Sequence, residues 1–236
     1  MKKTHASLGR RHFLTQTAGL AGLASFLPAR AIAAEGEAPA AAATTPEAAA
    51  QQLRAGNARF VAGTPTCRDL SNRRAELVGG QSPFAIIVSC SDSRVPVETI
   101  FDQEPGHVFG VRVAGNFVDP AGLGSIEYAV AVLKASYILV IGHEACGAVK
   151  AAIEYVKEGK KFPGSIQRLA EAIAPAAKAS KSMPGKWVHN ATAQNVRDTV
   201  ASVPKRSTIV ADAISAGKLG IAGAVYELAS GKVTML

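Results

Sequence analysis

Aromatic residues are scarce in this 236-residue sequence, at 6%, and charged residues make up only 19%. Alanine and glycine carry much of the apolar content instead, a composition that is tolerated where helices pack closely on a sheet. After residue 45 the sequence contains no internal repeat and no segment that resembles a linker. The length is sufficient for one substantial hydrophobic core, so residues 46–236 are predicted to form a single domain.

Acidic residues are absent from the first 33 positions, where five basic residues lie: Lys2, Lys3, Arg10, Arg11 and Arg30. This segment accounts for most of the formal net charge of +8. The rest of the chain carries only a small positive excess and no cluster of lysine or arginine. Because binding to a polyanion needs a basic patch or stripe, the sequence excludes nucleic acid as an expected partner.

The N-terminal segment also lacks an apolar run long enough to span a membrane. Thr15–Leu27 is shorter than the ~20 residues needed and is diluted by Gly, Ser and Thr, so a membrane anchor is the weaker reading and no stable insertion is expected. Arg10 and Arg11, followed by Phe13-Leu14, resemble a twin-arginine signal, and Ala31–Ala33 offers a cleavage site. We predict an export signal at 1–33, a flexible leader at 34–45, and a periplasmic location for the protein.

Short apolar runs alternate with helical patterns along the predicted domain. A helix begins at Pro46 and extends to about residue 60. The apolar runs at 84–89, 108–113 and 137–141 predict strands, and 219–228 is a last apolar run that turns into 233–236. Helical patterns occur at 123–133, 147–157, 165–178, 187–200 and 207–216. This alternation predicts an α/β fold with a mostly parallel central sheet flanked by helices.

Residues suited to metal binding follow two of these strands. Cys90 comes directly after the first strand, and His143 and Cys146 follow the strand that ends near Ile141. The carboxyl ends of parallel strands lie along one edge of a sheet, so these distant segments can meet there. Two cysteines and a histidine with an open fourth position are the pattern of a catalytic zinc site.

Other chemistry remains open on residue types alone. Cys90 and Cys146 could form a disulfide in an exported protein, which would leave Cys67 unpaired and His143 without a role. A structural zinc would need a fourth protein ligand, for which Asp92 is the nearby candidate. The metalloprotease pattern H-E-x-x-H fails because Gly147 stands where its second histidine belongs. The zinc-deaminase pattern is absent from the sequence.

Four motifs resemble those of the β-class carbonic anhydrases in their order and spacing. They are Cys-Ser-Asp-Ser-Arg at 90–94, Arg-Val-Ala-Gly-Asn at 112–116, Glu-Tyr-Ala-Val at 127–130 and Gly-His-x-x-Cys-Gly at 142–147. The resemblance covers essentially the whole chain after the leader. It implies an enzyme that converts carbon dioxide reversibly to bicarbonate and a proton by means of zinc-bound hydroxide. It also implies that Cys90, His143 and Cys146 bind the Zn²⁺.

The same resemblance implies roles for residues around the metal. Asp92 and Arg94 are expected to act as a catalytic dyad, in which the carboxylate accepts a hydrogen bond from the hydroxide and the guanidinium holds the carboxylate. The alternative, also found in the family, is that Asp92 binds zinc itself as a fourth ligand and closes the site. Substrate-binding positions are expected at Gln103, Phe109, Tyr128 and Gly147.

The resemblance further implies a homodimer or a homotetramer, with the helix that begins at Pro46 acting as an arm between subunits. One departure stands out. Family members regulated by bicarbonate at a separate site carry tryptophan where this chain has Ile87, so that regulation is not expected here, although Arg112 and Tyr128 are retained. Two rival functions stay open: hydrolysis of a related substrate such as carbon disulfide, and metal binding or sensing without catalysis.

Overall fold

A five-stranded sheet forms the centre of the computed structural model, which describes residues 45–66 and 70–236. The predicted export signal, nearly all of the leader and Cys67 lie outside the described residues. The strands are β1 (Ala85–Ser89), β2 (Val108–Arg112), β3 (Tyr137–His143), β4 (Gly220–Tyr226) and β5 (Val233–Met235). Their order is β2-β1-β3-β4-β5, and only the short edge strand β5 runs antiparallel to its neighbour. The predicted mostly parallel α/β sheet is confirmed.

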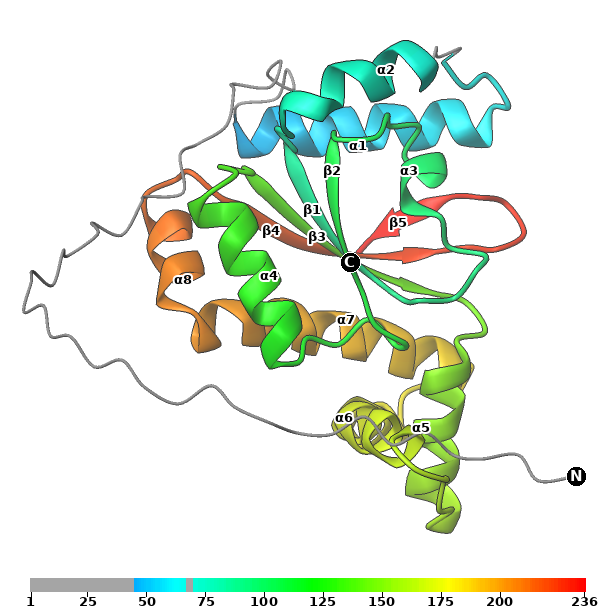
Figure 1. The fold of residues 1–236 in the computed structure, drawn as a ribbon. Coiled ribbons are helices and arrows are strands. Elements are labelled where there is room, and N and C mark those ends of the chain that lie inside the picture. Colours follow the sequence, from blue (N-terminus) through cyan, green and yellow to red (C-terminus); the bar gives the residue numbers. More distant parts are fainter. Residues whose placement is uncertain (1–44, 67–69) are drawn as a thin grey trace, which may run out of the picture. The chain divides into compact units, whose positions relative to one another are not determined.

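Helices cover both faces of this sheet (Figure 1). They are α1 (Pro46–Val61), α2 (Leu70–Glu76), α3 (Val97–Ile100), α4 (Pro120–Ala131), α5 (Gly147–Glu158), α6 (Ile166–Ala179), α7 (Trp187–Arg206) and α8 (Thr208–Ser215), with a short 3-10 turn, η1, at Leu77–Gly79. One hydrophobic cluster joins α1 and α3 to Ile87 and Leu139 of the strands. A second joins α4, α7 and α8 to Ile86 and Ile138, which point to the opposite face.

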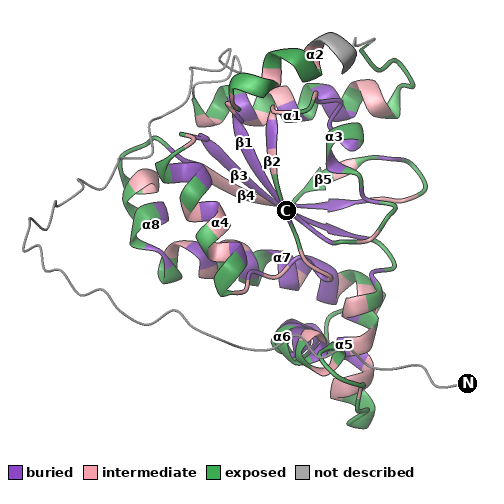
Figure 2. Cartoon of the chain, in the orientation of Figure 1, coloured by how far each residue is buried: buried purple, intermediate pink, exposed green. Residues whose placement is uncertain are grey.

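The strands are buried because both faces are covered (Figure 2). Every residue of β1 and of β3 is buried, which explains why both read in sequence as continuous apolar runs rather than alternating ones. Their register pairs Ser89 with Ile141, so the two strands end side by side. Residues that follow these two strands therefore emerge at the same edge of the sheet.

Helix α1 packs on its own chain through a buried asparagine. The Nδ2 of Asn57 donates to the carbonyl oxygens of Ile100 (3.1 Å) and Gly231 (2.9 Å), and its Oδ1 accepts from the Val233 amide (2.9 Å). These bonds fix α1 against α3 and against the hairpin that joins β4 to β5. The role of α1 as an arm between subunits stays a prediction.

Several element boundaries differ from those expected. The fourth helix starts at Pro120, three residues early, because the Asp119 side chain caps it by accepting from the Gly122 amide (2.7 Å). Helix α7 continues past residue 200 to Arg206, with Pro204 in its last turn. Helices α2 and α3 were not expected from sequence, because both are too short to show a helical period. Among the described residues, no helix has the length and apolar character required to cross a membrane.

Candidate metal centre

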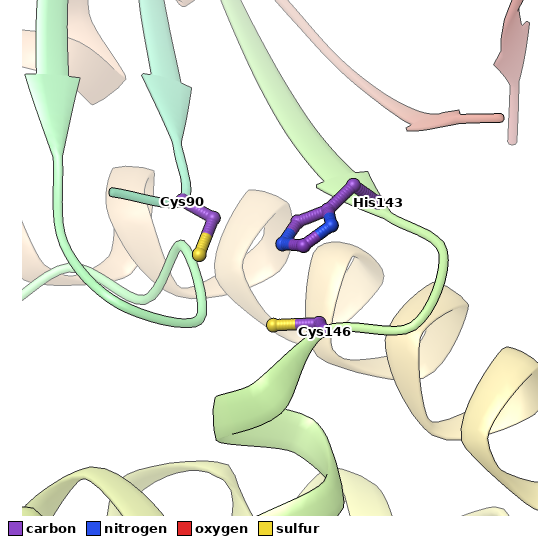
Figure 3. A group of neighbouring side chains, drawn as sticks. All are labelled: Cys90, His143 and Cys146. Atoms are coloured by element: carbon purple, nitrogen blue, oxygen red, sulfur yellow. The ribbon is translucent and has the colours of Figure 1, made fainter. Parts of the chain in front are cut away.

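Three side chains from two loops converge at the carboxyl edge of the sheet (Figure 3). Cys90 follows β1 directly, His143 is the last residue of β3, and Cys146 immediately precedes α5. One ligand atom from each of the three lies within 4.8 Å of the other two. Cys90 is 4% exposed, and neither His143 nor Cys146 has any exposed surface. Because β1 and β3 pair in parallel, Cys90, His143 and Cys146 lie close together, as the sequence predicted.

A tight turn places His143 and Cys146 on the same side of the loop. Ala145 adopts a left-handed backbone with φ of 55°, which turns the chain between the two ligands. The ring of His143 is fixed because its Nδ1 lies 2.9 Å from the Glu144 carbonyl oxygen. Its Nε2 is buried and has no hydrogen-bond partner among the residues that the structure describes. A buried ring nitrogen without a partner, facing two thiols, is the expected signature of a metal ligand.

The two cysteines are free thiols, so the disulfide alternative is not realised. The Cys146 thiol donates a hydrogen bond to Cys90, and this contact more than any other lowers the pKa of Cys90 to about 4. For Cys146 the same hydrogen bond, together with burial, raises the pKa far above its usual range. The two thiols therefore titrate as a coupled pair, which loses one proton readily and retains the other. Binding of a divalent metal displaces that proton.

Backbone amides stabilise both sulfurs. The Sγ of Cys90 accepts from the amides of Gly115 (3.2 Å) and Asp92 (3.4 Å). Cys146 stands at the N-terminus of α5, where the amides of Ala148 and Val149 act to lower its pKa. These donors compensate negative charge on sulfur. The donor set and its burial suit zinc, which binds thiolate sulfur and imidazole nitrogen in a tetrahedral arrangement.

Asp92 and Arg94 form a bidentate ion pair beside this group. Arg94 donates from Nε to Oδ1 at 2.9 Å and from Nη2 to Oδ2 at 2.7 Å. These hydrogen bonds hold the pKa of the Asp92 carboxyl well below its usual range. The Oδ2 atom lies 3.8 Å from Nε2 of His143, so the carboxylate reaches the edge of the metal group while it remains bound to Arg94.

Arg112 contacts the loop that carries Cys90, a contact that was not expected from the sequence. Its Nη2 donates to the carbonyl oxygens of Cys90 (3.1 Å) and Asp92 (2.8 Å), and its Nε also donates to that of Cys90 (3.2 Å). The guanidinium therefore holds the loop that carries the first metal ligand. The sequence placed Arg112 near the end of the predicted strand 108–113, but its position opposite Ser89 of β1 is known from the structure.

The predicted substrate-binding residues lie in different parts of the fold. Gly147 is the first residue of α5, adjacent to Cys146. Phe109 and Tyr128 contact each other, with ring centroids 6.4 Å apart, and Tyr128 is 49% exposed. Gln103 is buried, and its amide bonds to Gln52 of α1 (3.0 Å) and to its own loop at Phe101 (2.7 Å). Its assignment to substrate stays a prediction without support from these contacts.

Comparison with known proteins places this geometry in a family. A family model described as carbonic anhydrase matches residues 85–233. A carbonic anhydrase from Mycolicibacterium smegmatis is 43% identical over 193 residues, which cover 81% of this chain and 94% of that protein. Carbonic anhydrase 2 from Mycobacterium tuberculosis is 42% identical over 193 residues, with 81% and 93% covered.

Solved structures agree. A β-carbonic anhydrase from Coccomyxa, determined in complex with acetazolamide, is 31% identical with a TM-score of 0.63, covering 70% of this chain and 77% of that one. A tetrameric β-carbonic anhydrase from Sordaria macrospora is 27% identical with a TM-score of 0.63, covering 70% and 86%. Both matches extend over most of this chain. By sequence and by fold, the chain belongs to the β class of the carbonic anhydrase family.

Proposed function

We propose that this protein catalyses the reversible hydration of carbon dioxide to bicarbonate and a proton at a zinc ion held by Cys90, His143 and Cys146. The observation that carries the proposal is the convergence of two free thiols and an unpartnered, buried imidazole nitrogen within 4.8 Å, in a chain of this family. Zinc is a Lewis acid that lowers the pKa of a coordinated water. A carbonic anhydrase is the standard example of this effect.

Asp92 and Arg94 then act on the attacking oxygen. Both oxygens of the Asp92 carboxylate accept from Arg94, which fixes the plane of the group and keeps it ionised. Such a carboxylate can accept a hydrogen bond from the nucleophile and orient its lone pair toward carbon dioxide. Because the carboxylate is bound to Arg94, a fourth coordination position remains for solvent. This supports the open arrangement over the form in which Asp92 is a ligand.

Substrate binding is proposed for Phe109, Tyr128 and Gly147. Gly147 lies next to a metal ligand and has no side chain to obstruct the approach to it. The Phe109–Tyr128 pair offers an apolar aromatic surface, which suits an uncharged, apolar substrate such as carbon dioxide.

Two measurements on the purified protein test this function. Metal analysis should give one zinc per chain, and stopped-flow mixing with a pH indicator should show rapid hydration of carbon dioxide. Bound zinc without hydration would contradict the proposal and favour a related substrate, such as carbon disulfide, or a non-catalytic metal protein. Absence of zinc from protein purified without chelator would contradict the assigned ligands.

We also propose a homodimer or homotetramer. The exposed aromatic Tyr128 beside Phe109 supports a contact between copies of the chain, and the Sordaria macrospora relative is a tetramer. Sedimentation velocity should give a mass of two or four chains. A monomer at micromolar concentration would contradict this.

Export through a twin-arginine signal is a further proposal, and it rests on the sequence of residues 1–33 alone. Replacement of Arg10 and Arg11 by lysine should retain the protein in the cytoplasmic fraction of a bacterial host. The unaltered chain should appear in the periplasmic fraction. Equal distribution of the two proteins would overturn the proposal.

A further inference from the structure

Helix α7 packs against two segments of the metal site: the end of β3, and the loop around Gly115 that contacts Cys90. A side chain at Gly142, which precedes His143, would collide with Thr192 and Val196, since the nearest atoms of both lie 2.8 Å from a Cβ placed there. Between these two positions on the same helix, Asn195 reaches the second of these segments, the loop next to Cys90. Residues three and four apart share one helical face, so a single face of α7 contacts both segments.

Asn195 contacts that loop through a polar group. Its side chain is 4% exposed, and its Nδ2 donates a 2.8 Å hydrogen bond to the carbonyl oxygen of Gly115. The amide of the same Gly115 donates to the Sγ of Cys90 at 3.2 Å. A continuous chain of hydrogen bonds thus connects α7 to a metal ligand 105 positions earlier in the sequence.

Gly115 has little freedom to take another position. Its backbone is left-handed, with φ of +84°, and a Cβ there would lie 2.3 Å from Cδ1 of Ile173 and 3.0 Å from Cβ of Ala148. The residue is therefore enclosed by α5, α6 and α7. The amide and the carbonyl of Gly115 belong to successive peptide groups that meet at its Cα. The hydrogen bond from Asn195 restrains the second of these groups, and the enclosed Cα transmits that restraint to the first, whose amide faces Cys90.

We propose that Asn195 is a positioning residue of the metal centre, which orients Gly115 so that its amide donates to the Cys90 thiolate. A hydrogen bond to a thiolate ligand withdraws charge from sulfur and holds the ligand in its coordinating direction. The inference rests on the proposed zinc site but concerns a residue outside the ligand set. Its prediction is specific, because loss of Asn195 changes the metal–sulfur bond of Cys90 and not merely the stability of the core.

The test compares Asn195→Leu, which keeps the branched shape of the side chain and removes the donor, with Thr192→Val as the matched control. Thr192 lies on the same face of α7, and its hydroxyl bonds only within the helix, to the Val188 carbonyl oxygen at 2.8 Å. Zinc affinity is measured by competition with a chromogenic chelator. Each protein is also loaded with cobalt(II), whose thiolate-to-metal charge-transfer band reports the charge on sulfur.

Asn195→Leu should bind zinc about 10-fold to 100-fold more weakly and shift the cobalt charge-transfer band to longer wavelength. Thr192→Val should lose thermal stability without either change. If Asn195→Leu were destabilised like the control while its zinc affinity and cobalt spectrum matched the wild type, the inference would be overturned. Failure of the wild-type protein to bind zinc would instead contradict the proposed function, so the two failures are distinguishable.

A second measurement needs no variant. In ¹⁵N-labelled wild-type protein loaded with ¹¹³Cd, the amide proton of Gly115 should show a scalar coupling to the metal through its hydrogen bond to Cys90. An amide at Gly115 without this coupling would overturn the inference even if Asn195→Leu failed to fold.

Discussion

Arg94 holds Asp92 by two parallel hydrogen bonds, from Nε to Oδ1 at 2.9 Å and from Nη2 to Oδ2 at 2.7 Å. The side chain of Arg94 is 53% exposed and that of Asp92 is 18% exposed, so the pair lies at the rim of the buried metal group. An exposed ion pair contributes little to stability. Its effect here is geometric, because it holds the Asp92 carboxylate in a fixed orientation with Oδ2 at 3.8 Å from Nε2 of His143.

Arg94→Lys should reduce kcat/KM for carbon dioxide by about 10-fold to 100-fold while zinc content stays at one per chain. A lysine offers a single point charge and cannot hold both carboxylate oxygens, so Asp92 is freed to turn toward the metal. Stopped-flow kinetics and metal analysis on the same sample measure both quantities. The exposed Arg168→Lys on α6 serves as control. Unchanged activity in Arg94→Lys would contradict the proposed role of the pair.

Cys146→Ser should abolish both stoichiometric zinc binding and catalysed hydration. The serine hydroxyl is a poor zinc ligand, and the site would retain only two of its three protein donors. Cys67→Ser is the natural control, since Cys67 is assigned to no site. Elemental analysis after gel filtration and stopped-flow assays give the result. Retention of zinc and turnover in Cys146→Ser would remove the basis of the assignment.

Arg112→Lys should lower kcat/KM by about 10-fold, because one ammonium group cannot bond the carbonyl oxygens of both Cys90 and Asp92. A suitable control is Arg206→Lys, since Arg206 also donates to a backbone carbonyl, that of Val118, at 2.6 Å. Both variants lose a contact to the main chain, but only the first loosens the ligand loop. Equal kinetic effects of the two substitutions would argue that Arg112 serves stability alone.

Tyr137 provides a test of pH-dependent stability away from the metal. Burial raises the pKa of its hydroxyl, and Arg54 offsets this in part. Above the ordinary tyrosine pKa of about 10, the unfolded chain loses a proton that the folded chain retains, so the free energy of unfolding falls as pH rises. Urea unfolding of zinc-free protein between pH 8 and 11 should show a steeper decline for the wild type than for Tyr137→Phe. Parallel curves would contradict the raised pKa.

The metal ligands were predictable from sequence because each follows an apolar run. In a parallel sheet, the end of one strand fixes where the end of the next lies, so Cys90 and His143 could be placed together without coordinates. The contribution of Asn195 was not predictable. It depends on how α7 crosses the sheet, and a single asparagine within a helical pattern carries no sign of a partner 80 positions earlier.

Short and irregular segments also could not be predicted from the sequence. Helix α3 has four residues, too few for a periodic signal, yet it receives one of the hydrogen bonds that fix α1. The family resemblance assigned Gln103 to the substrate site, but the sequence did not indicate that its side-chain amide bonds to Gln52 and Phe101. Such outcomes are decided by side-chain packing between elements, which local residue patterns do not encode.

The pairing of β1 with β3 determines when the protein can first acquire its metal. Cys90 leaves the ribosome more than 50 residues before Cys146, and the nascent chain holds no group of these three donors until both strands have joined. Zinc uptake during biosynthesis must therefore await assembly of the sheet. Capture of the ion accordingly indicates that β1 and β3 have paired, and a translation product truncated before Cys146 would lack the full set of donors.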